Sequence, residues 1–273
     1  MAVKGMYLMP TGEVTWNREM ELYGGDRNQK TREQMFAVLI DTDDGYVLID
    51  TGYPPADKRV FEYLNEPSKD SSSIIEGVPW ARADNWKVTS VTDIRKCLKN
   101  HGLKPDDIRY VVVTHFHWDH VGGAKFFKNS KIVVHKDALS YAKWPDPFWK
   151  NNFHIKEWWD LDAMGLKYEV VLGDKLIVPG VMVMFTPGHA YGHLSVIINC
   201  PKDGQIIWAG DIFHVQDNWE KRLPMDDMNF ATHDPQEWFK SWDRIKAYAD
   251  MNNARVYASH DYEYLNSIPW EYH

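Results

Sequence analysis

Short runs of β-branched and aromatic residues recur along the chain, and each run has the length of one strand. These runs cover residues 35–40, 46–50, 110–114, 131–134, 181–186, 194–199, 205–209 and 255–258. Helical patterns lie between them at 91–101 and 235–252, and Asp234 followed by Pro235 marks the start of the second helix. This mixed order favours an α+β fold in which sheets pack together and helices lie outside.

One large domain is expected over residues 1–273, because this length is short for two full domains. A hydrophobic fraction of 44% and a charged fraction of 26% are typical of a globular protein with a substantial core. Two segments are predicted to be insertions: residues 67–88, rich in Ser and charges, and residues 144–166, rich in Trp and Pro.

Charge and hydropathy exclude several classes of function. The net charge of −8 argues against a nucleic-acid partner. The segment before Pro10 lacks the apolar stretch of a signal peptide, and no apolar run is long enough to span a membrane, so a soluble cytoplasmic protein is expected. Cys97 and Cys200 lie far apart in sequence and form no metal or redox motif.

Four potential metal ligands follow the predicted strand at 110–114 within six residues: His115, His117, Asp119 and His120. In an extended segment the first two side chains point the same way, and the last is reached after a turn, so one short peptide could serve two metals. We expect the glycines at 122–123 to allow a tight turn from which a helix begins. Imidazole and carboxylate donors suit zinc or a similar metal, and the absence of Cys argues against a thiolate site.

Three further candidate ligands also follow predicted strands, where loops gather functional groups. They are His189 in Pro-Gly-His, Asp211 in Gly-Asp and His260 in Ser-His. Together with the His-x-His-x-Asp-His motif at 115–120, they form one set in a fixed order along nearly the whole chain. A set of this size is much more specific than any single histidine, which alone would be a structural residue.

This ordered set resembles the metallo-β-lactamase superfamily. The resemblance implies an αβ/βα four-layer sandwich with two divalent metal ions at one edge of the sheets; the donors suit zinc, and also manganese, iron or cobalt. It assigns His115, His117 and His189 to one metal, Asp119, His120 and His260 to the other, and Asp211 to the position between them.

Within that superfamily, five His and two Asp ligands are similar to the set of the lactonase branch, which includes acyl-homoserine lactonases and pyridoxolactonase-like enzymes. The resemblance implies that a metal-bridging hydroxide opens a lactone and that Asp119 also passes a proton to the leaving oxygen. Those lactonases usually carry a Tyr three residues after the bridging Asp, whereas this chain has His214. We expect the His214 imidazole to bind the substrate carbonyl in catalysis; the alternatives are that water donates this hydrogen bond or that the bond is not made at all.

Other functions remain open at the level of the sequence, because the same ligands serve several reactions. A thioesterase similar to glyoxalase II or another ester hydrolase is the enzymatic alternative. A metal-stabilised binding protein is the non-enzymatic one. The sequence leaves the oligomeric state undecided, with a homodimer among the options.

Residues around the predicted ligands have two classes of expected role. His193 and Asp50 are expected to orient ligands or to support the structure rather than to bind metal. Trp144, Phe148 and Trp149 either line a pocket for an apolar appendage of a small lactone or ester, or pack in a satellite core under a long loop.

Overall fold

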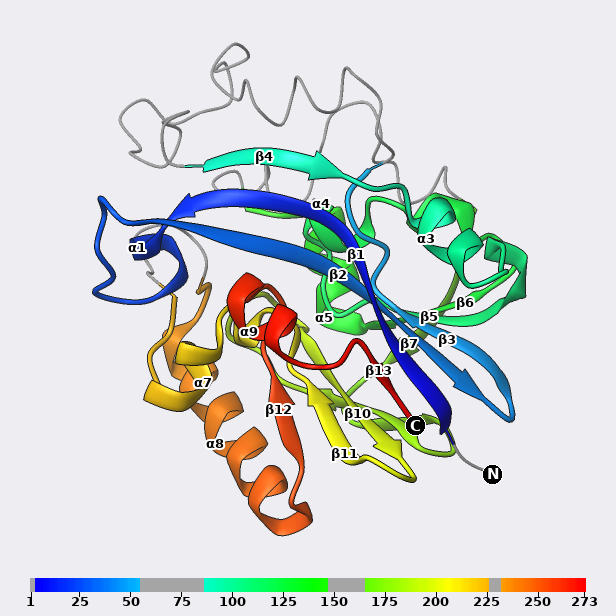
Figure 1. The fold of residues 1–273 in the computed structure, drawn as a ribbon. Coiled ribbons are helices and arrows are strands. Elements are labelled where there is room, and N and C mark those ends of the chain that lie inside the picture. Colours follow the sequence, from blue (N-terminus) through cyan, green and yellow to red (C-terminus); the bar gives the residue numbers. More distant parts are fainter. Residues whose placement is uncertain (1–2, 55–85, 147–164, 226–231) are drawn as a thin grey trace.

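Two β-sheets form the centre of the molecule (Figure 1). The computed structural model describes residues 3–54, 86–146, 165–225 and 232–273. Within these ranges, the strands of the first sheet run in the order β13-β1-β2-β3-β5-β6-β7, with β4 also paired to β1. The second sheet has the order β12-β11-β10-β9-β8.

The first sheet contains both the longest strands and the parallel strands that lead into the candidate site. Its strands are β1 (Val3–Asn17), β2 (Lys30–Thr42), β3 (Gly45–Ile49), β4 (Trp86–Val91), β5 (Ile108–Val112), β6 (Lys131–His135), β7 (Lys167–Val171) and β13 (Glu271–Tyr272). Strands β3, β5, β6 and β7 are parallel to one another, whereas β1, β2 and β3 pair antiparallel.

The second sheet is smaller. Its strands are β8 (Lys175–Val178), β9 (Val181–Phe185), β10 (Leu194–Cys200), β11 (Gly204–Trp208) and β12 (Arg255–Tyr257). Strands β8 to β11 pair antiparallel, and β12 joins β11 in parallel.

Helices cover the outer faces or cap the strand ends. The α-helices are α1 (Arg18–Glu21), α3 (Ile94–Asn100), α4 (Trp118–Val121), α5 (Lys136–Lys143), α7 (Gln216–Lys221), α8 (Pro235–Asn252) and α9 (Tyr262–Ser267). Short 3-10 helices are η3 (Pro105–Asp107), η4 (Ala124–Phe126) and η5 (Gly210–Ile212).

Alternate residues of the central strands enter different layers of the core, as the period of two in a strand requires. In β5, Val112 packs between the two sheets, whereas Val111 packs under α3 and α5. In β11, Trp208 faces the space between the sheets and Ile207 packs with α8. The layers are therefore helix, sheet, sheet, helix, and the predicted α+β four-layer sandwich is confirmed (Figure 1).

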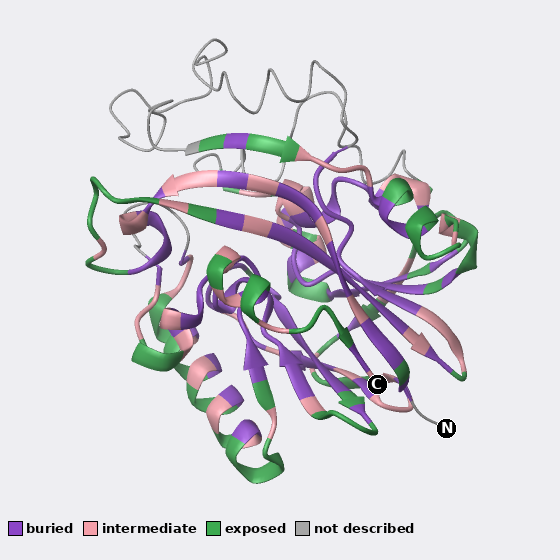
Figure 2. Ribbon diagram, in the orientation of Figure 1, coloured by how far each residue is buried: buried purple, intermediate pink, exposed green. Residues whose placement is uncertain are grey.

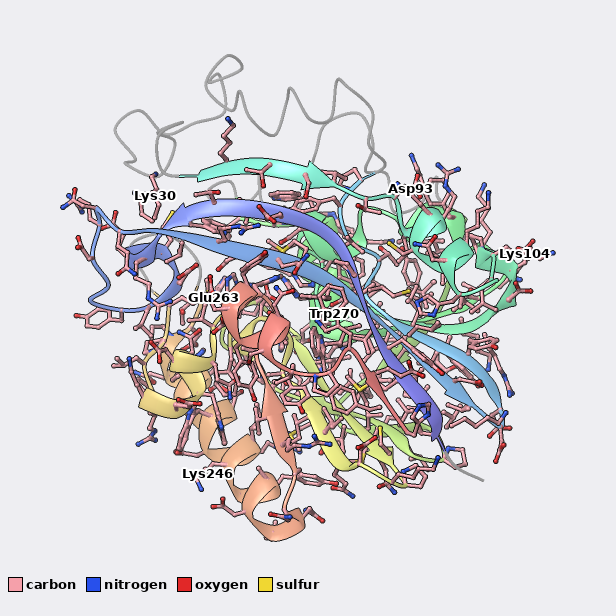
Figure 3. The ribbon with its side chains drawn as sticks, in the orientation of Figure 1. Lys30, Asp93, Lys104, Lys246, Glu263 and Trp270 are labelled. Atoms are coloured by element: carbon pink, nitrogen blue, oxygen red, sulfur yellow. The ribbon has the colours of Figure 1, made fainter. Side chains whose placement is uncertain are left out.

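Burial follows this layering. Strands are mostly buried, and α8 alternates between buried and exposed positions (Figure 2). Charged side chains such as Lys30, Lys104 and Glu263 lie at the outside (Figure 3). Within the described ranges, no helix has the length and apolar character needed to cross a membrane.

Each of the eight predicted strands overlaps an observed strand, and the predicted helix at 235–252 coincides with α8. The Asp234 side chain caps that helix by accepting hydrogen bonds from the backbone N–H groups of Gln236 and Glu237. The helix predicted over 91–101 begins only at Ile94, because Val91 belongs to β4 and Asp93 is the capping residue. That prediction was wrong for its first turn.

Strand β1 was not among the predicted runs, although it has the most extensive pairing of any strand. Pro10 has no backbone N–H, and the register against β2 shifts between Pro10 and Gly12. The pattern of a regular strand is interrupted at this bulge, and only the pairing with two neighbours makes the strand continuous.

The two predicted insertions lie mainly outside the described residues. Residues 86–88 of the first segment form the start of β4, which pairs with β1. In the second, Trp144 is 77% exposed at the end of α5. The remaining described residues, 145–146 and 165–166, flank the rest of that segment.

The residue that follows α4 has to be a glycine, because two backbone segments approach each other closely there. A Cβ atom added to Gly122 would lie 2.0 Å from the backbone nitrogen of Pro54. The Gly122 N–H also donates a hydrogen bond to the carbonyl of Gly52 at 2.9 Å. The glycine therefore allows the helix that carries Asp119 and His120 to lie directly against the loop after β3.

We predict that Gly122→Ala lowers the free energy of unfolding by about 2 kcal/mol or more, because backbone atoms must separate to accommodate the methyl group. The matched control is Gly173→Ala, since a Cβ there meets no atom within 4 Å. Chemical denaturation of both variants measures the difference. Equal stabilities of the two variants would contradict this account of Gly122.

Candidate metal centre

The seven predicted ligands come from four loops that follow β5, β9, β11 and β12. The structure brings their donor atoms together in two groups that share Asp211. One group contains His115, His117, His189 and Asp211; the other contains Asp119, His120, His260 and Asp211. Within each group, the donor atoms all lie within 4.8 Å of one another.

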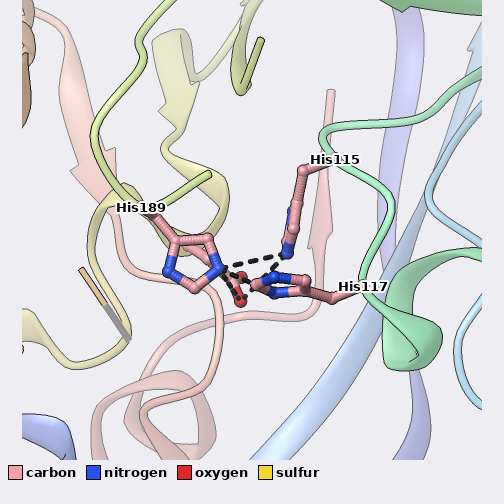
Figure 4. A group of neighbouring side chains, drawn as sticks. His115, His117 and His189 are labelled. Atoms are coloured by element: carbon pink, nitrogen blue, oxygen red, sulfur yellow. Dashed lines mark hydrogen bonds and ion pairs between the residues drawn. The ribbon is translucent and has the colours of Figure 1, made fainter. Parts of the chain in front are cut away.

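Three imidazoles of the first group point toward a common centre (Figure 4). His189 Nε2 lies 3.2 Å from His115 Nε2 and 3.0 Å from His117 Nδ1. Asp211 Oδ2 completes the group at 3.5 Å from His189 Nε2 and 3.7 Å from His115 Nε2.

The second group is built around the other side of Asp211. His120 Nε2 lies 3.1 Å from Asp211 Oδ2 and 3.7 Å from Asp119 Oδ2. His260 Nε2 lies 2.9 Å from Asp211 Oδ1. One carboxylate thus faces both groups, in the arrangement that the resemblance implies.

The geometry of both groups fits divalent metal ions. Nitrogen ligands at the usual zinc distance in a tetrahedral site lie about 3.3 Å apart, close to the separations in the first group. Among the described residues, neither ring nitrogen of the buried His260 has a hydrogen-bond partner, although Nε2 lies close to Asp211. Because these donors converge on common points, the fold and the two His/Asp groups indicate a divalent-metal site.

Burial keeps the imidazoles of the first group neutral, as metal ligands must be. It lowers the pKa of His117 to about 3 and holds the pKa values of His115 and His189 well below the usual value. Neutral rings keep a nitrogen lone pair for a cation.

Asp50 holds His120 from the side opposite Asp211. The His120 Nδ1–H donates to Asp50 Oδ2 at 2.8 Å, which leaves Nε2 facing the second group. Asp50 also accepts hydrogen bonds from the backbone N–H and the hydroxyl of Thr114, each at 2.8 Å. Its φ of 57° lies in the left-handed region, so the backbone accepts strain at a residue that orients a ligand.

His193 and Ser259 hold Asp211. The Asp211 backbone N–H donates to His193 Nε2 at 3.0 Å, so the His193 proton resides on Nδ1, 3.0 Å from the Thr186 carbonyl oxygen. The Ser259 hydroxyl donates to Asp211 Oδ1 at 2.8 Å. His193 and Asp50 therefore lie behind the two groups and contact their members, as residues that orient metal ligands do.

His214 is buried beside the same carboxylate. Its Nε2 lies 3.0 Å from Asp211 Oδ2, and its Nδ1 lies 3.2 Å from Glu33 Oε1. Burial alone would lower the pKa of His214, but Asp211 and Glu33 outweigh burial and raise that pKa to about 10. Glu33 was not identified from the sequence, because a charged residue in a strand is ordinarily solvent-exposed.

The predicted substrate residues are only partly described. Phe148 and Trp149 lie outside the described residues. Trp144 is exposed, which excludes a position in the core for this side chain. Trp118, which was not predicted to have a role, lies between two candidate ligands and packs against Tyr53 with ring centroids 5.0 Å apart.

The expected helix after the glycines at 122–123 was wrong in detail. The helix α4 precedes them and itself carries Asp119 and His120, and only the short η4 follows. Both glycines have negative φ values, so they are required by the close approach of Pro54 and Thr51 rather than by a left-handed turn.

The sequence profile of the metallo-beta-lactamase superfamily matches residues 31–260. This chain therefore belongs to that superfamily.

Relatives within the superfamily point to the lactonase branch, and the predicted resemblance to it is confirmed. The chain is 27% identical over 263 residues to an N-acyl homoserine lactonase of Bacillus cereus, covering 96% of this chain and 95% of that protein. It is 32% identical over 171 residues to the N-acyl homoserine lactonase AttM of Rhizobium radiobacter, covering 60% of this chain and 62% of that protein.

Solved structures agree with these relatives. A point mutant of Bacillus thuringiensis AiiA, with N-decanoyl-L-homoserine bound at its active site, has a TM-score of 0.79 at 26% identity and covers 98% of each chain. An N-acyl homoserine lactone hydrolase with the product N-hexanoyl-L-homoserine at its catalytic metal centre gives the same score, identity and coverage.

We predict two metal ions per chain, because each group has donors from three or more side chains and both share Asp211. Elemental analysis of protein prepared in zinc-supplemented medium measures this ratio. His115→Ala should lower it, whereas the control His101→Ala changes an exposed residue outside both groups and should leave it unchanged. A wild-type ratio that never exceeds about one metal per chain would contradict the dinuclear assignment.

Asp50→Asn should weaken metal binding at the second group by about ten- to a hundredfold, because the ring of His120 loses its charged partner. Asn tolerates the left-handed backbone at this position, so the variant tests the carboxylate rather than the conformation. Competition with a chelator measures the affinity, and Asp44→Asn, which changes a half-buried carboxylate outside both groups, serves as the control. Unchanged affinity in Asp50→Asn would show that His120 needs no such support.

Proposed function

We propose that this chain is a dinuclear metal hydrolase that opens N-acyl homoserine lactones. The proposal of hydrolysis rests on the two His/Asp groups, which share one buried carboxylate, Asp211. The choice of a lactone is supported by relatives of this name that align with 96% of the chain. Such an activity would quench signalling by these lactones.

The donor set supports zinc as the resident metal, since imidazole and carboxylate are common zinc ligands, although manganese, iron and cobalt also accept them. His115, His117 and His189 would hold one ion, and Asp119, His120 and His260 the other, with Asp211 shared. When bound, the two ions would supply Lewis acidity to the substrate and would lower the pKa of a bound water molecule.

Protein groups would supply orientation and proton transfer. Asp119 lies in the second group on α4, where its carboxylate can hold a cation and also carry a proton to the leaving alkoxide oxygen. His214 has its Nε2 beside Asp211 Oδ2 and occupies the sequence position where the lactonase branch usually carries Tyr, which supports a role in binding the lactone carbonyl. Its role as a donor there requires a proton on Nε2.

The acyl appendage requires an apolar surface near the metal centre. Trp118 is adjacent in sequence to two candidate ligands, and its aromatic ring offers such a surface. We retain Trp144, Phe148 and Trp149 as further substrate-binding residues on the basis of the sequence. Each methylene buried against aromatic walls would contribute about 0.8 kcal/mol.

A panel of substrates tests the function directly. We expect zinc-loaded protein to hydrolyse N-acyl homoserine lactones far faster than thioesters, phosphodiesters or β-lactams, with kcat/KM rising as the acyl chain lengthens. Faster turnover of thioesters would instead favour an enzyme similar to glyoxalase II. Fully metal-loaded protein that turns over none of these substrates would favour a metal-stabilised binding protein.

Asp119→Asn should reduce kcat by about a hundredfold or more with little change in KM, because the proton transfer is needed only in the transition state. Steady-state kinetics on one lactone, with the metal content of each preparation measured, separates this effect from metal loss. Wild-type kcat in a metal-replete Asp119→Asn variant would remove Asp119 from the mechanism. Asp107→Asn, an exposed change outside both groups, is the control.

A further inference from the structure

We infer that Glu33 is a positioning residue for His214: its carboxylate accepts the Nδ1–H of the imidazole and thereby aims Nε2 at the reaction centre. The inference rests on the proposed function, since it gives His214 the place of the usual lactonase Tyr. It assigns a role to a residue on β2 that is 181 positions away from its partner in sequence.

Glu33 is a buried carboxylate with one side-chain partner among the described residues. The residue has no solvent exposure, and Oε1 contacts His214 Nδ1 at 3.2 Å. Within the described ranges, the other oxygen, Oε2, has no hydrogen-bond partner. Burying a carboxylate destabilises the folded state unless the charge is paired. A function for the contact with His214 would account for a buried carboxylate at this position.

The backbone fixes this contact. The Gln34 N–H donates to the His260 carbonyl at 3.0 Å, and the His260 N–H donates to the His214 carbonyl at 2.9 Å. Glu33 itself forms an isolated β-bridge with Asp261. Main-chain hydrogen bonds thus link the segment of Glu33 to that of His260, and the segment of His260 to that of His214. These bonds hold the side chains of Glu33 and His214 next to each other.

The same arrangement occurs at His120, another imidazole that faces Asp211 Oδ2. Asp50 accepts the Nδ1–H of His120 at 2.8 Å, and His120 Nε2 lies 3.1 Å from Asp211 Oδ2. The distances for Glu33 and His214 are 3.2 and 3.0 Å. A carboxylate behind one ring nitrogen fixes both the orientation of the ring and the site of its proton.

An imidazole needs this partner in a way that a phenol does not. A Tyr hydroxyl is one group that both donates and accepts, whereas His has two ring nitrogens whose roles depend on which carries the proton. With Nδ1–H bonded to Glu33, Nε2 faces Asp211 Oδ2, and the ring donates from Nε2 as an imidazolium that carries a proton on each nitrogen. Glu33 thus gives His214 a fixed partner that a Tyr at this position would not need.

The test combines kinetics with a direct measurement of the ring protons. Glu33→Ala removes the acceptor, whereas Glu33→Gln keeps an oxygen that can accept the Nδ1–H. The control is Glu21→Gln, because Glu21 is also buried and its charge interacts with that of Glu33, but it bonds to Arg18 and Thr31 and not to His214. All variants are prepared with zinc and checked for metal content and stability.

We expect Glu33→Ala to lower kcat/KM by about tenfold or more, Glu33→Gln by less, and Glu21→Gln to remain within about twofold of wild type. In a His214→Ala background, Glu33→Ala should cause no further loss, since a residue that acts only through His214 has nothing left to position. Equal losses from Glu33→Ala in both backgrounds would overturn the inference.

Nitrogen-15 NMR of histidine-labelled, zinc-loaded protein provides a readout that does not depend on activity. The ring signals of His214, assigned by their loss in His214→Ala, should show a hydrogen-bonded proton on Nδ1 that changes in Glu33→Ala but not in Glu21→Gln. A His214 ring without a proton on Nδ1 in the wild type would overturn the inference, whether or not lactones are hydrolysed. If lactones are hydrolysed and Glu33→Ala has wild-type kcat/KM, only this inference fails; absence of lactone turnover by wild type counts against the proposed function alone.

Discussion

The buried carboxylate of Asp211 is the point on which the candidate centre depends. Its Oδ1 faces Ser259 and His260, and its Oδ2 faces His120 and His214. A charge removed from water needs such compensation, so the loops after four different strands must converge on it. Imidazoles from these loops hold the pKa of Asp211 well below its usual value, although burial acts in the opposite direction.

Residues around Asp211 adopt strained or closely packed conformations that hold these loops in place. Asp50 adopts a left-handed backbone, and Gly210 allows His193 to approach closely, because a Cβ there would lie 2.7 Å from His193 Nε2. On the far side, α8 packs against the loop before His189: a Cβ at Gly188 would lie 2.5 Å from the Trp238 backbone. Strain and close packing of this kind are tolerated where they orient functional groups.

Much of the fold could be predicted from local patterns. Strands such as β5 and β10 are buried on both faces and contain continuous runs of Val and Ile, and α8 carries its own cap and apolar spacing. Strand β1 and the start of α3 could not be predicted in this way. Their boundaries depend on pairing with neighbours, which tolerates Pro10 in a bulge and draws Val91 into β4.

The sequence by itself determined which side chains could act as ligands, because His-x-His-x-Asp-His and three later motifs keep the donors in a recognisable order. The family resemblance of that order also implied how they divide into two groups around Asp211, and only the tertiary structure decided which side chains lie behind each ring. Glu33 shows the difference most clearly: in sequence it is a charged residue in a strand, and in space it faces His214. Orientation of an imidazole depends on a contact between distant segments, and no local pattern of residues encodes such a contact.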